Sequence, residues 1–200
     1  MPGQIKIDDG AGNYTILTNA GSLGSDKTIT LPNTTGTMAL TSDITSGLSA
    51  AQQWQLTANI TTTGVNDITT NLATPTTSIS GQLGSLVSES SGIFSFSETG
   101  IYGILVYSHA SYNQDGAYAQ VYVKGTNDNF STETRLATTI GKGRSSTESN
   151  SSVFLIVDIQ DTANDKIKFQ SDITTNGFLK GYATTGNANT SFVFMKLGET

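Results

Sequence analysis

The chain has 200 residues and a formal net charge of −6. Only 13% of its residues are charged, against about 25% in an ordinary globular protein. The few basic residues are scattered singly, so the basic patch that nucleic acid requires is missing. Cysteine is absent, which excludes disulfides and thiolate metal sites. No 18-residue apolar run predicts a membrane span, and the first residues lack the basic start and apolar stretch of a secretory signal.

The residue types favour an all-β protein. Seven Tyr, eight Phe and many Thr, Val and Ile suit strands, while Gly and Asn suit tight turns. The length allows one main core and a smaller appendage. We predict three regions: a β anchor or collar over residues 1–45, a short linker over 46–56 and a main domain over 57–200.

The first region contains four short β-type runs: QIKI, YTIL, TITL and TMAL. Each run is too short to form a core, and an isolated two-stranded piece is marginal in water. Their partners lie either in the same chain or in neighbouring copies, and we favour neighbouring copies. Pro32 ends the third run, and Gly36 provides a turn before the fourth.

The second region, residues 46–56, is the one stretch with a helical pattern. Thr45 or Ser46 is placed to cap a helix, and Leu48, Ala51 and Leu56 lie roughly on one helical face. The alternative is a polar linker that leads to Trp54, the first large apolar anchor. The pattern by itself leaves both readings open.

The main domain contains long runs rich in β-branched and aromatic residues, bounded by Gly, Asn or Asp. They cover residues 92–112, 117–125, 151–160, 165–173 and 190–198. Regular strands of this kind predict a jelly-roll sandwich of about eight to ten strands.

The run over residues 92–112 is apolar on both faces. Because side chains alternate along a strand, Tyr102 and Val106 share one face, whereas Leu105, Tyr107 and His109 share the other. One face meets the opposing sheet of the sandwich. The other needs a second cover, and a neighbouring subunit is the simplest supplier, so this strand predicts an oligomer.

The same run carries a family resemblance. Phe94, Gly100, Tyr102 and Ile104 resemble the F-x5-G-x-Y-x-F signature of the tumour necrosis factor/complement globular-head superfamily, with Ile104 in place of an aromatic. VFLIVDIQDTANDKIKF resembles the late strand pair of that superfamily, around Asp165. SFVFMKLG resembles its closing strand, without the usual glycine. The resemblance covers roughly residues 54–198.

This resemblance implies a jelly roll that forms a three-fold homotrimer through an aromatic-rich sheet face and has no enzymatic activity. The residues that it places at the trimer interface are Tyr102, Leu105, Tyr107, His109, Phe192 and Phe194.

A second resemblance lies in TITLPNTTGTMALTSDI. This segment is similar to an element of bacteriophage fibre and other virion proteins that links a stalk or anchor to a distal domain. It implies a location on the virion surface after synthesis in the host cytoplasm, with attachment to other virion proteins of the capsid or of the tail or fibre base. The residues that carry the match and the expected attachment are Thr30, Leu31, Pro32, Thr35, Gly36, Thr37 and Leu40.

The sequence offers no catalytic constellation, and we expect no cofactor and no resident metal. His109 is the single histidine, so it cannot build a multi-histidine metal site or a triad with a visible nucleophile. We interpret it as a packed or interface residue, with a pH-sensitive contact between trimer copies as the alternative.

Three loop segments suggest chemistry but lack the required spacing. Asp115 and Asp128 offer oxygen ligands for calcium but miss the D-x-[DN]-x-[DN]-G pattern, and Asp115-Gly116 suits a hairpin turn. GKGRSS over 141–146 lacks the phosphate-loop pattern, so we interpret it as a solvated loop, with an anionic glycan contact as the alternative.

We therefore predict a virion fibre or receptor-binding module whose loops contact a host-surface glycan or protein. The alternative is a capsid decoration protein that stabilises the head at three-fold positions, which the shortness of the chain favours; a depolymerase is the third hypothesis. The candidate contact residues are Tyr112, Asn113, Gln114, Asp115, Asn127, Asn129, Lys142, Arg144 and Tyr182.

Overall fold

The structure of the protein is a computed structural model. It describes residues 5–8, 11, 14–17, 48, 50–76, 82–182 and 189–200. The chain divides into two compact units, Met1–Ile44 and Thr45–Thr200. Within the described residues, no helix is long and apolar enough to cross a membrane.

The described part of the first unit is a small antiparallel hairpin. Strand β1 (Ile5–Asp8) pairs with β2 (Tyr14–Leu17), and Ile5 lies opposite Leu17. The expectation that neighbouring copies pair with these two runs is therefore wrong, because each finds its partner in its own chain. The segment 26–44 lies outside the described residues, with all the predicted attachment positions: Thr30, Leu31, Pro32, Thr35, Gly36, Thr37 and Leu40.

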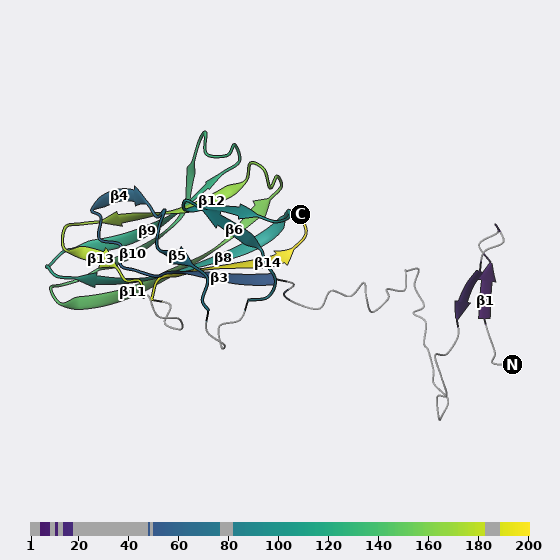
Figure 1. Ribbon diagram of the computed structural model, residues 1–200, viewed down its shortest axis with the longest axis horizontal. Helices are drawn as coiled ribbons and strands as arrows, with labels where there is room; N and C mark the ends of the chain where they lie inside the picture. The colour runs from purple at the N-terminus through teal and green to yellow at the C-terminus, as the bar shows by residue number, and fades with distance from the viewer. Residues whose placement is uncertain are drawn as a thin grey trace, which may run out of the picture. The chain divides into compact units, whose positions relative to one another are not determined.

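The second unit is an all-β, two-sheet jelly-roll sandwich, as the sequence predicted (Figure 1). Its strands are β3 (Ala50–Leu56), β4 (Gly64–Asp67), β5 (Leu72–Ala73), β6 (Val87–Ser90), β7 (Ile93–Phe96), β8 (Gly100–Tyr112), β9 (Tyr118–Thr126), β10 (Thr134–Lys142), β11 (Thr147–Ile159), β12 (Lys166–Ile173), β13 (Gly177–Leu179) and β14 (Ser191–Gly198).

Each sheet has six strands. The β9 sheet has the order β10-β9-β12-β7-β6, with β4 also paired to β12. The β8 sheet has the order β11-β8-β14-β3-β5, with β13 also paired to β8. All pairs are antiparallel, and β8 and β11 are matched over their full lengths. The central strand of each sheet is therefore covered on both edges.

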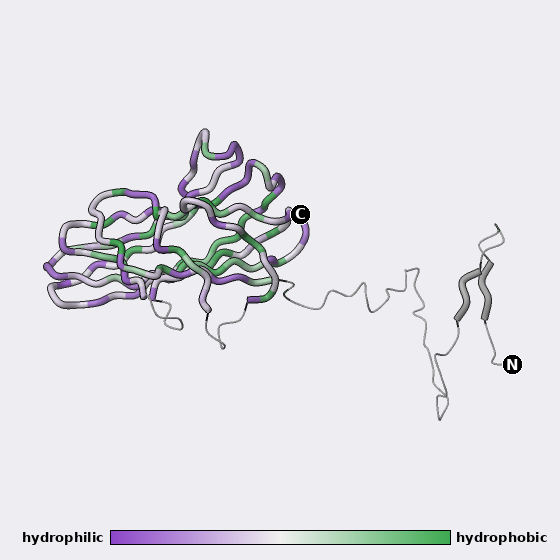
Figure 2. The backbone as a smooth tube through the Cα atoms, in the orientation of Figure 1, coloured by the Kyte–Doolittle hydropathy of each residue, from purple (hydrophilic) through white to green (hydrophobic). Residues whose placement is uncertain are grey.

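Aromatic rings from both sheets fill the core. Phe169 of β12 stacks on Phe192 of β14 with ring centroids 3.9 Å apart, and Phe94 packs edge-on against Trp54 at 5.4 Å. These contacts join the two sheets, since their members come from opposite layers. Figure 2 shows the hydrophobic backbone segments concentrated in the body of the sandwich and the hydrophilic segments at its loops. The core thus forms as the alternation along each strand predicts.

Residues 50–56 form strand β3, so the predictions of a helix or of a linker over 46–56 are wrong there. The strand lies between β14 and β5. Gln52 is buried, and its Oε1 accepts hydrogen bonds from the main-chain N–H groups of Leu86 and Val87 at 2.9 and 2.8 Å. Tertiary pairing overrides the weak helical pattern, because the edge of β14 supplies hydrogen-bond partners for the backbone N–H and C=O groups of this segment.

The Asp115-Gly116 turn is not a hairpin. It connects β8 to β9, and these strands belong to different sheets. Gly116 has a φ of +77°, a conformation that glycine adopts freely. The turn chemistry predicted at this position is present, but it carries the chain from one sheet across to the other.

The sandwich has two distinct ends. The chain enters β3 at Ala50, which lies opposite Lys196, and Lys196 lies opposite Tyr102 near the start of β8. We call this the terminal end; the loops 127–133 and 160–165 share it. At the other end lie the loops 113–117, 143–146 and 174–176, which we call the loop end. In Figure 1 the C-terminus marks the terminal end, and β4 and β13 lie toward the opposite one.

Candidate interaction surfaces

The outer face of the β8 sheet carries exposed apolar side chains. On β8, Ile104 and Val106 are fully buried and point inward. Side chains alternate along a strand, so Leu105 and Tyr107 point outward. On β11, Phe154 is 50% and Ile156 62% exposed. The members of this apolar outer face are Leu105, Tyr107, Phe154, Ile156, Val193, Met195 and Leu197.

These side chains form one continuous patch. Leu105 lies opposite Phe154 on one side and opposite Val193 on the other. A Cβ built on Gly103 would lie 2.8 Å from the Phe154 ring and 3.4 Å from Leu197 Cδ1. Phe154 and Leu197 therefore lie above Gly103 from opposite sides. A continuous apolar patch of this kind marks an interaction surface.

The structure corrects half of the predicted trimer interface. Tyr102, Phe192 and Phe194 have no exposed surface and pack between the two sheets, so they cannot contact another subunit. Leu105 and Tyr107 remain on the outer face, half-buried. Sequence reasoning missed Phe154 and Ile156, although the alternation in VFLIVDI contains the signal for them.

His109 lies on the same outer face, toward the loop end, within a charged cluster. Its Nε2 is 2.9 Å from Glu148 Oε2, and Lys180 Nζ bonds the other oxygen of the same carboxylate. The hydrogen bond from Lys180, followed by that from His109, lowers the pKa of Glu148. The outer face thus changes from apolar near the terminal end to charged near the loop end.

The three loops of the loop end are tied to one another. Asp115 Oδ1 accepts a hydrogen bond from the main-chain N–H of Ser145 at 2.8 Å. Asn176 Nδ2 donates to Gln114 Oε1 at 2.7 Å, and the Asn113 N–H donates to the Asn176 carbonyl at 2.8 Å. Hydrogen bonds therefore hold the candidate residues Asn113, Gln114 and Asp115 in one surface, to which Lys142 and Arg144 add two exposed basic side chains.

Tyr112 is not available for such a contact, which corrects its prediction. Its side chain is fully buried, and its hydroxyl lies 2.7 Å from Ser149 Oγ. Burial raises the pKa of the Tyr112 hydroxyl. A Cβ on Gly143 would lie 1.9 Å from the Tyr112 ring. The glycine-rich GKG segment thus makes room for a buried aromatic ring.

A groove opens at the loop end between β4, the 113–117 loop and the end of β12. Its volume is about 440 Å³. It is lined by Thr63, Gly64, Gln114, Asp115, Gly116, Ala117, Ile173, Thr174 and Thr175. Two of the predicted contact residues, Gln114 and Asp115, therefore lie in a concave polar site.

The remaining loop candidates lie elsewhere. Asn127 and Asn129 are exposed on the 127–133 loop, at the terminal end. In this loop Asp128 accepts hydrogen bonds from Thr126 Oγ1 and from the Thr132 N–H, at 2.6 and 2.9 Å, which organise the turn. Tyr182, which is 44% exposed, follows β13. The structure therefore separates the predicted contact residues into groups at opposite ends.

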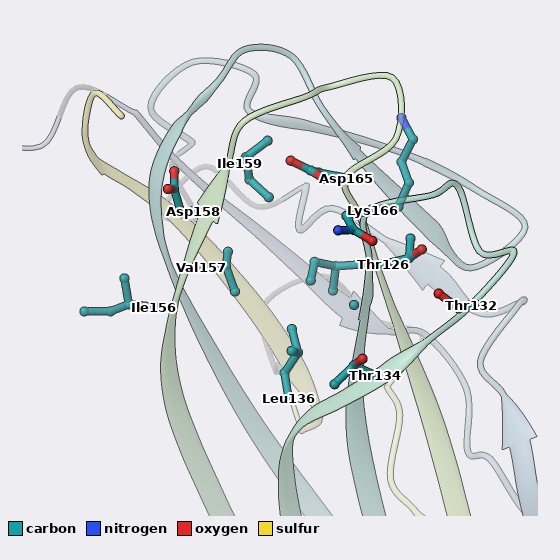
Figure 3. A pocket seen from close by; sticks show the side chains of 13 residues that line it. Thr126, Thr132, Thr134, Leu136, Ile156, Val157, Asp158, Ile159, Asp165 and Lys166 are labelled. Atoms are coloured by element: carbon teal, nitrogen blue, oxygen red, sulfur yellow. The ribbon is translucent and has the colours of Figure 1, made fainter.

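The terminal end also has a cavity, of about 410 Å³, at the open edge between β10 and β11. In Figure 3, Leu136, Val157 and Ile159 point into this space, whereas Ile156 and Asp158 point to the other side of β11. The lining of the cavity is mixed, with apolar side chains beside polar ones such as Thr126, Thr132 and Thr134. Within the described residues, no group of three or more His, Asp or Glu side chains is placed to hold a metal ion.

No protein-family model and no curated protein sequence matches the chain. Solved structures do match. Eiger TNF from S. frugiperda aligns with a TM-score of 0.55 at 10% identity, covering 77% of this chain and 96% of that one. Murine APRIL aligns with a TM-score of 0.51 at 15% identity, covering 74% and 98%. The sandwich therefore has the tumour necrosis factor type of jelly-roll fold, and identities this low show the fold alone.

The vertex protein P5 of PRD1 also aligns, with a TM-score of 0.47 at 13% identity over 76% of this chain and 100% of that one. A similarity this remote carries no argument about role.

Proposed function

We propose that this protein is a non-enzymatic, trimeric surface protein of a bacteriophage virion. In this proposal the N-terminal part attaches to the particle, and the jelly-roll head faces outward as a receptor-binding module for a host-surface glycan or protein. The virion location rests on the similarity of TITLPNTTGTMALTSDI to the linking element of phage fibre proteins.

The observation that carries the receptor-binding role is the difference between the two ends of the sandwich. The chain enters at Ala50, at the terminal end, whereas three interlocked polar loops and a groove lie at the loop end. In this proposal the particle lies toward the terminal end of the sandwich, where β3 begins, and the loop end is the opposite end of the same unit. Loops on a rigid scaffold are where binding residues concentrate.

The trimer rests on the apolar outer face. Phe154, Ile156 and Leu197 are each about half exposed or more, on one continuous surface. Burial of such a face against a second copy is favourable by about 25 cal/mol for each Å² of apolar surface. The superfamily that the signature resembles uses a sheet face in the same way.

Two measurements test the proposal. Light scattering on the full chain should give about three times the 21.0 kDa chain mass, and a 21 kDa species would contradict the trimer. Antibody labelling of intact particles should place the protein on the tail or fibre. Labelling confined to the head shell, with capsids that burst more readily in its absence and normal adsorption, would instead establish a decoration protein and overturn the receptor-binding role.

A further inference from the structure

The groove at the loop end has the dimensions of a ligand site. Its volume of about 440 Å³ lies within the ~300–1,000 Å³ range of small-molecule sites. Three segments that are distant in the sequence form it: 63–64, 114–117 and 173–175. Ala117 and Ile173 give it a small apolar part, and the other lining residues are polar or glycine.

Two glycines line this groove. Gly64 and Gly116 have φ values of +79° and +77°, and a Cβ built on either would find nothing within 4 Å. The space above both residues is therefore open. Glycines at such positions let a ligand approach the chain closely.

The side chains present donors and acceptors with little charge. Thr63 and Thr175 are exposed at its border, and Gln114 still has amide hydrogens beyond its bond with Asn176. Asp115 uses Oδ1 for the Ser145 N–H, and no described residue donates to its Oδ2. Among the described lining residues Asp115 alone is charged, so the lining itself offers no cation to an anionic ligand.

Hydrogen bonds hold two sides of the groove before any ligand binds. Thr174 Oγ1 accepts a hydrogen bond from the Tyr118 N–H at 2.8 Å, and the Gly116 N–H donates to the Gly143 carbonyl at 3.1 Å. Together with the Asp115–Ser145 and Gln114–Asn176 bonds, these contacts tie the loops 113–117, 143–146 and 174–176 to one another. Less ordering entropy is then lost on binding.

We propose that this groove binds a neutral, hydroxyl-rich saccharide. Sugar hydroxyls both donate and accept, which matches the amide, hydroxyl and carboxylate groups that line it. No aromatic side chain is among the described lining residues, so a single site binds without ring stacking, with Kd on the order of 1 mM. The inference rests on the proposed adhesive role, in which a trimer multiplies weak sites through avidity.

The test is a titration of the full ¹⁵N-labelled chain, observed by NMR. The probes are neutral oligosaccharides of glucose, mannose, galactose and N-acetylglucosamine, with a heparin hexasaccharide as the anionic probe. At millimolar concentrations, at least one neutral probe should shift the amide signals of Gly64 and Gly116 to saturation. The inference is overturned if no neutral probe shifts them or if only the heparin fragment does.

Two variants locate the binding. Thr175→Arg places a long side chain at the groove, so we expect Kd for the neutral probe to rise about tenfold. Asp115→Asn keeps an acceptor for the Ser145 N–H and replaces the charged Oδ2 acceptor by an amide donor, and should raise Kd about fivefold. The matched control is Thr134→Arg, an exposed threonine that lines the cavity at the terminal end, and it should leave Kd unchanged. Equal effects of both arginine variants, or no effect of Thr175→Arg and Asp115→Asn, would remove the site from this groove.

The saccharide inference and the proposed function fail separately. If labelled particles carry the protein on the tail but no neutral saccharide binds, the adhesive role stands and the receptor is not a neutral glycan. If a neutral saccharide binds in the groove but the protein is not on the virion, the site stands and the virion role is wrong.

Discussion

At several positions of this protein, glycine is required because a neighbouring side chain occupies the space that a Cβ would fill, and not because of turn geometry alone. Gly141 and Gly143 face the buried Tyr112 ring and the Ser149 hydroxyl, and Gly103 lies under the Phe154 ring. In each case a methyl group would occupy space that a neighbouring side chain fills. The glycine-rich segment that superficially resembles a phosphate loop is therefore a packing feature of the loop end.

We expect Gly143→Ala to lower the free energy of unfolding by about 1–3 kcal/mol, the usual cost of overpacking. The new Cβ would lie 1.9 Å from Tyr112 Cδ2, which forces the ring or the loop to move. Denaturant midpoints with unchanged slope measure the effect. The control is Gly198→Ala, where nothing lies within 4 Å, and it should be close to neutral. Equal midpoints for the two variants would show that the loop moves aside without cost.

At the scale of single strands, β3 is positioned by two interactions that the local sequence does not display. Its backbone pairs with β14, and Gln52 reaches across the sandwich to the main chain at the start of β6.

Ion pairs connect the strands on the outer surface of the β9 sheet. Glu133 accepts from Lys124 at 2.8 Å, and Lys168 pairs with both Glu133 and Asp67 at 2.6 and 3.0 Å. Polar side chains thus connect strands that are distant in the sequence.

Replacement of Gln52 by Leu should cost about 1–3 kcal/mol for each donor left unsatisfied, since the Leu86 and Val87 N–H groups lose their acceptor. Thermal and denaturant unfolding report the change. Gln120→Leu, on the half-buried outer side of β9, serves as the matched control and should shift stability by less than about 0.5 kcal/mol. A Gln52→Leu protein as stable as the control would mean that water or a local shift satisfies both donors.

Glu133→Gln tests the charged network through its pH dependence. Hydrogen bonds from Lys124, then from Lys168, lower the pKa of Glu133 below its ordinary value of 4.5. The stabilisation that the ionised Glu133 carboxylate provides is therefore present above pH 4.5 and is lost as the pH falls through the lowered pKa. We expect the variant to be less stable by about 0–1 kcal/mol at neutral pH, as for an exposed pair.

The difference between wild type and Glu133→Gln should shrink in acid and at high salt, measured from unfolding midpoints at several pH values. A difference that stays constant from neutral pH to well below pH 4.5 would show that the carboxylate acts through packing and not through charge.

For the jelly-roll unit as a whole, the two broad faces of the sandwich differ in chemistry. The outer face of the β8 sheet is apolar over much of its length, whereas that of the β9 sheet carries the Lys124–Glu133–Lys168 network. The two ends differ as well, because the chain enters at one and the polar groove lies at the other. This asymmetry underlies the proposal that the trimer forms through one face and that binding occurs at one end.

Phe154→Asp should convert the proposed trimer into a folded monomer. The ring is 50% exposed in the single chain, so a charge there is solvated in the monomer but desolvated in the interface. Light scattering measures the mass, and far-UV circular dichroism checks the fold. Ile140→Asp is the control, because Ile140 is 48% exposed on the β9 sheet and should leave the assembly intact. If Phe154→Asp keeps the mass of the wild type, this face is not the subunit interface.

The sequence by itself determined the all-β class, most of the long strands and the doubly apolar character of β8, because alternation with period two is a local property of the chain. It missed β10, in which most residues are exposed and the alternation is weak, and it mistook β3 for a helix or a linker. Only the tertiary structure decided which face of β8 is inside, burying Tyr102 and leaving Tyr107 outside, because two apolar faces look alike until an opposing sheet covers one. The same holds for the groove, since Gly64, Asp115 and Thr175 become neighbours only when three strand ends meet.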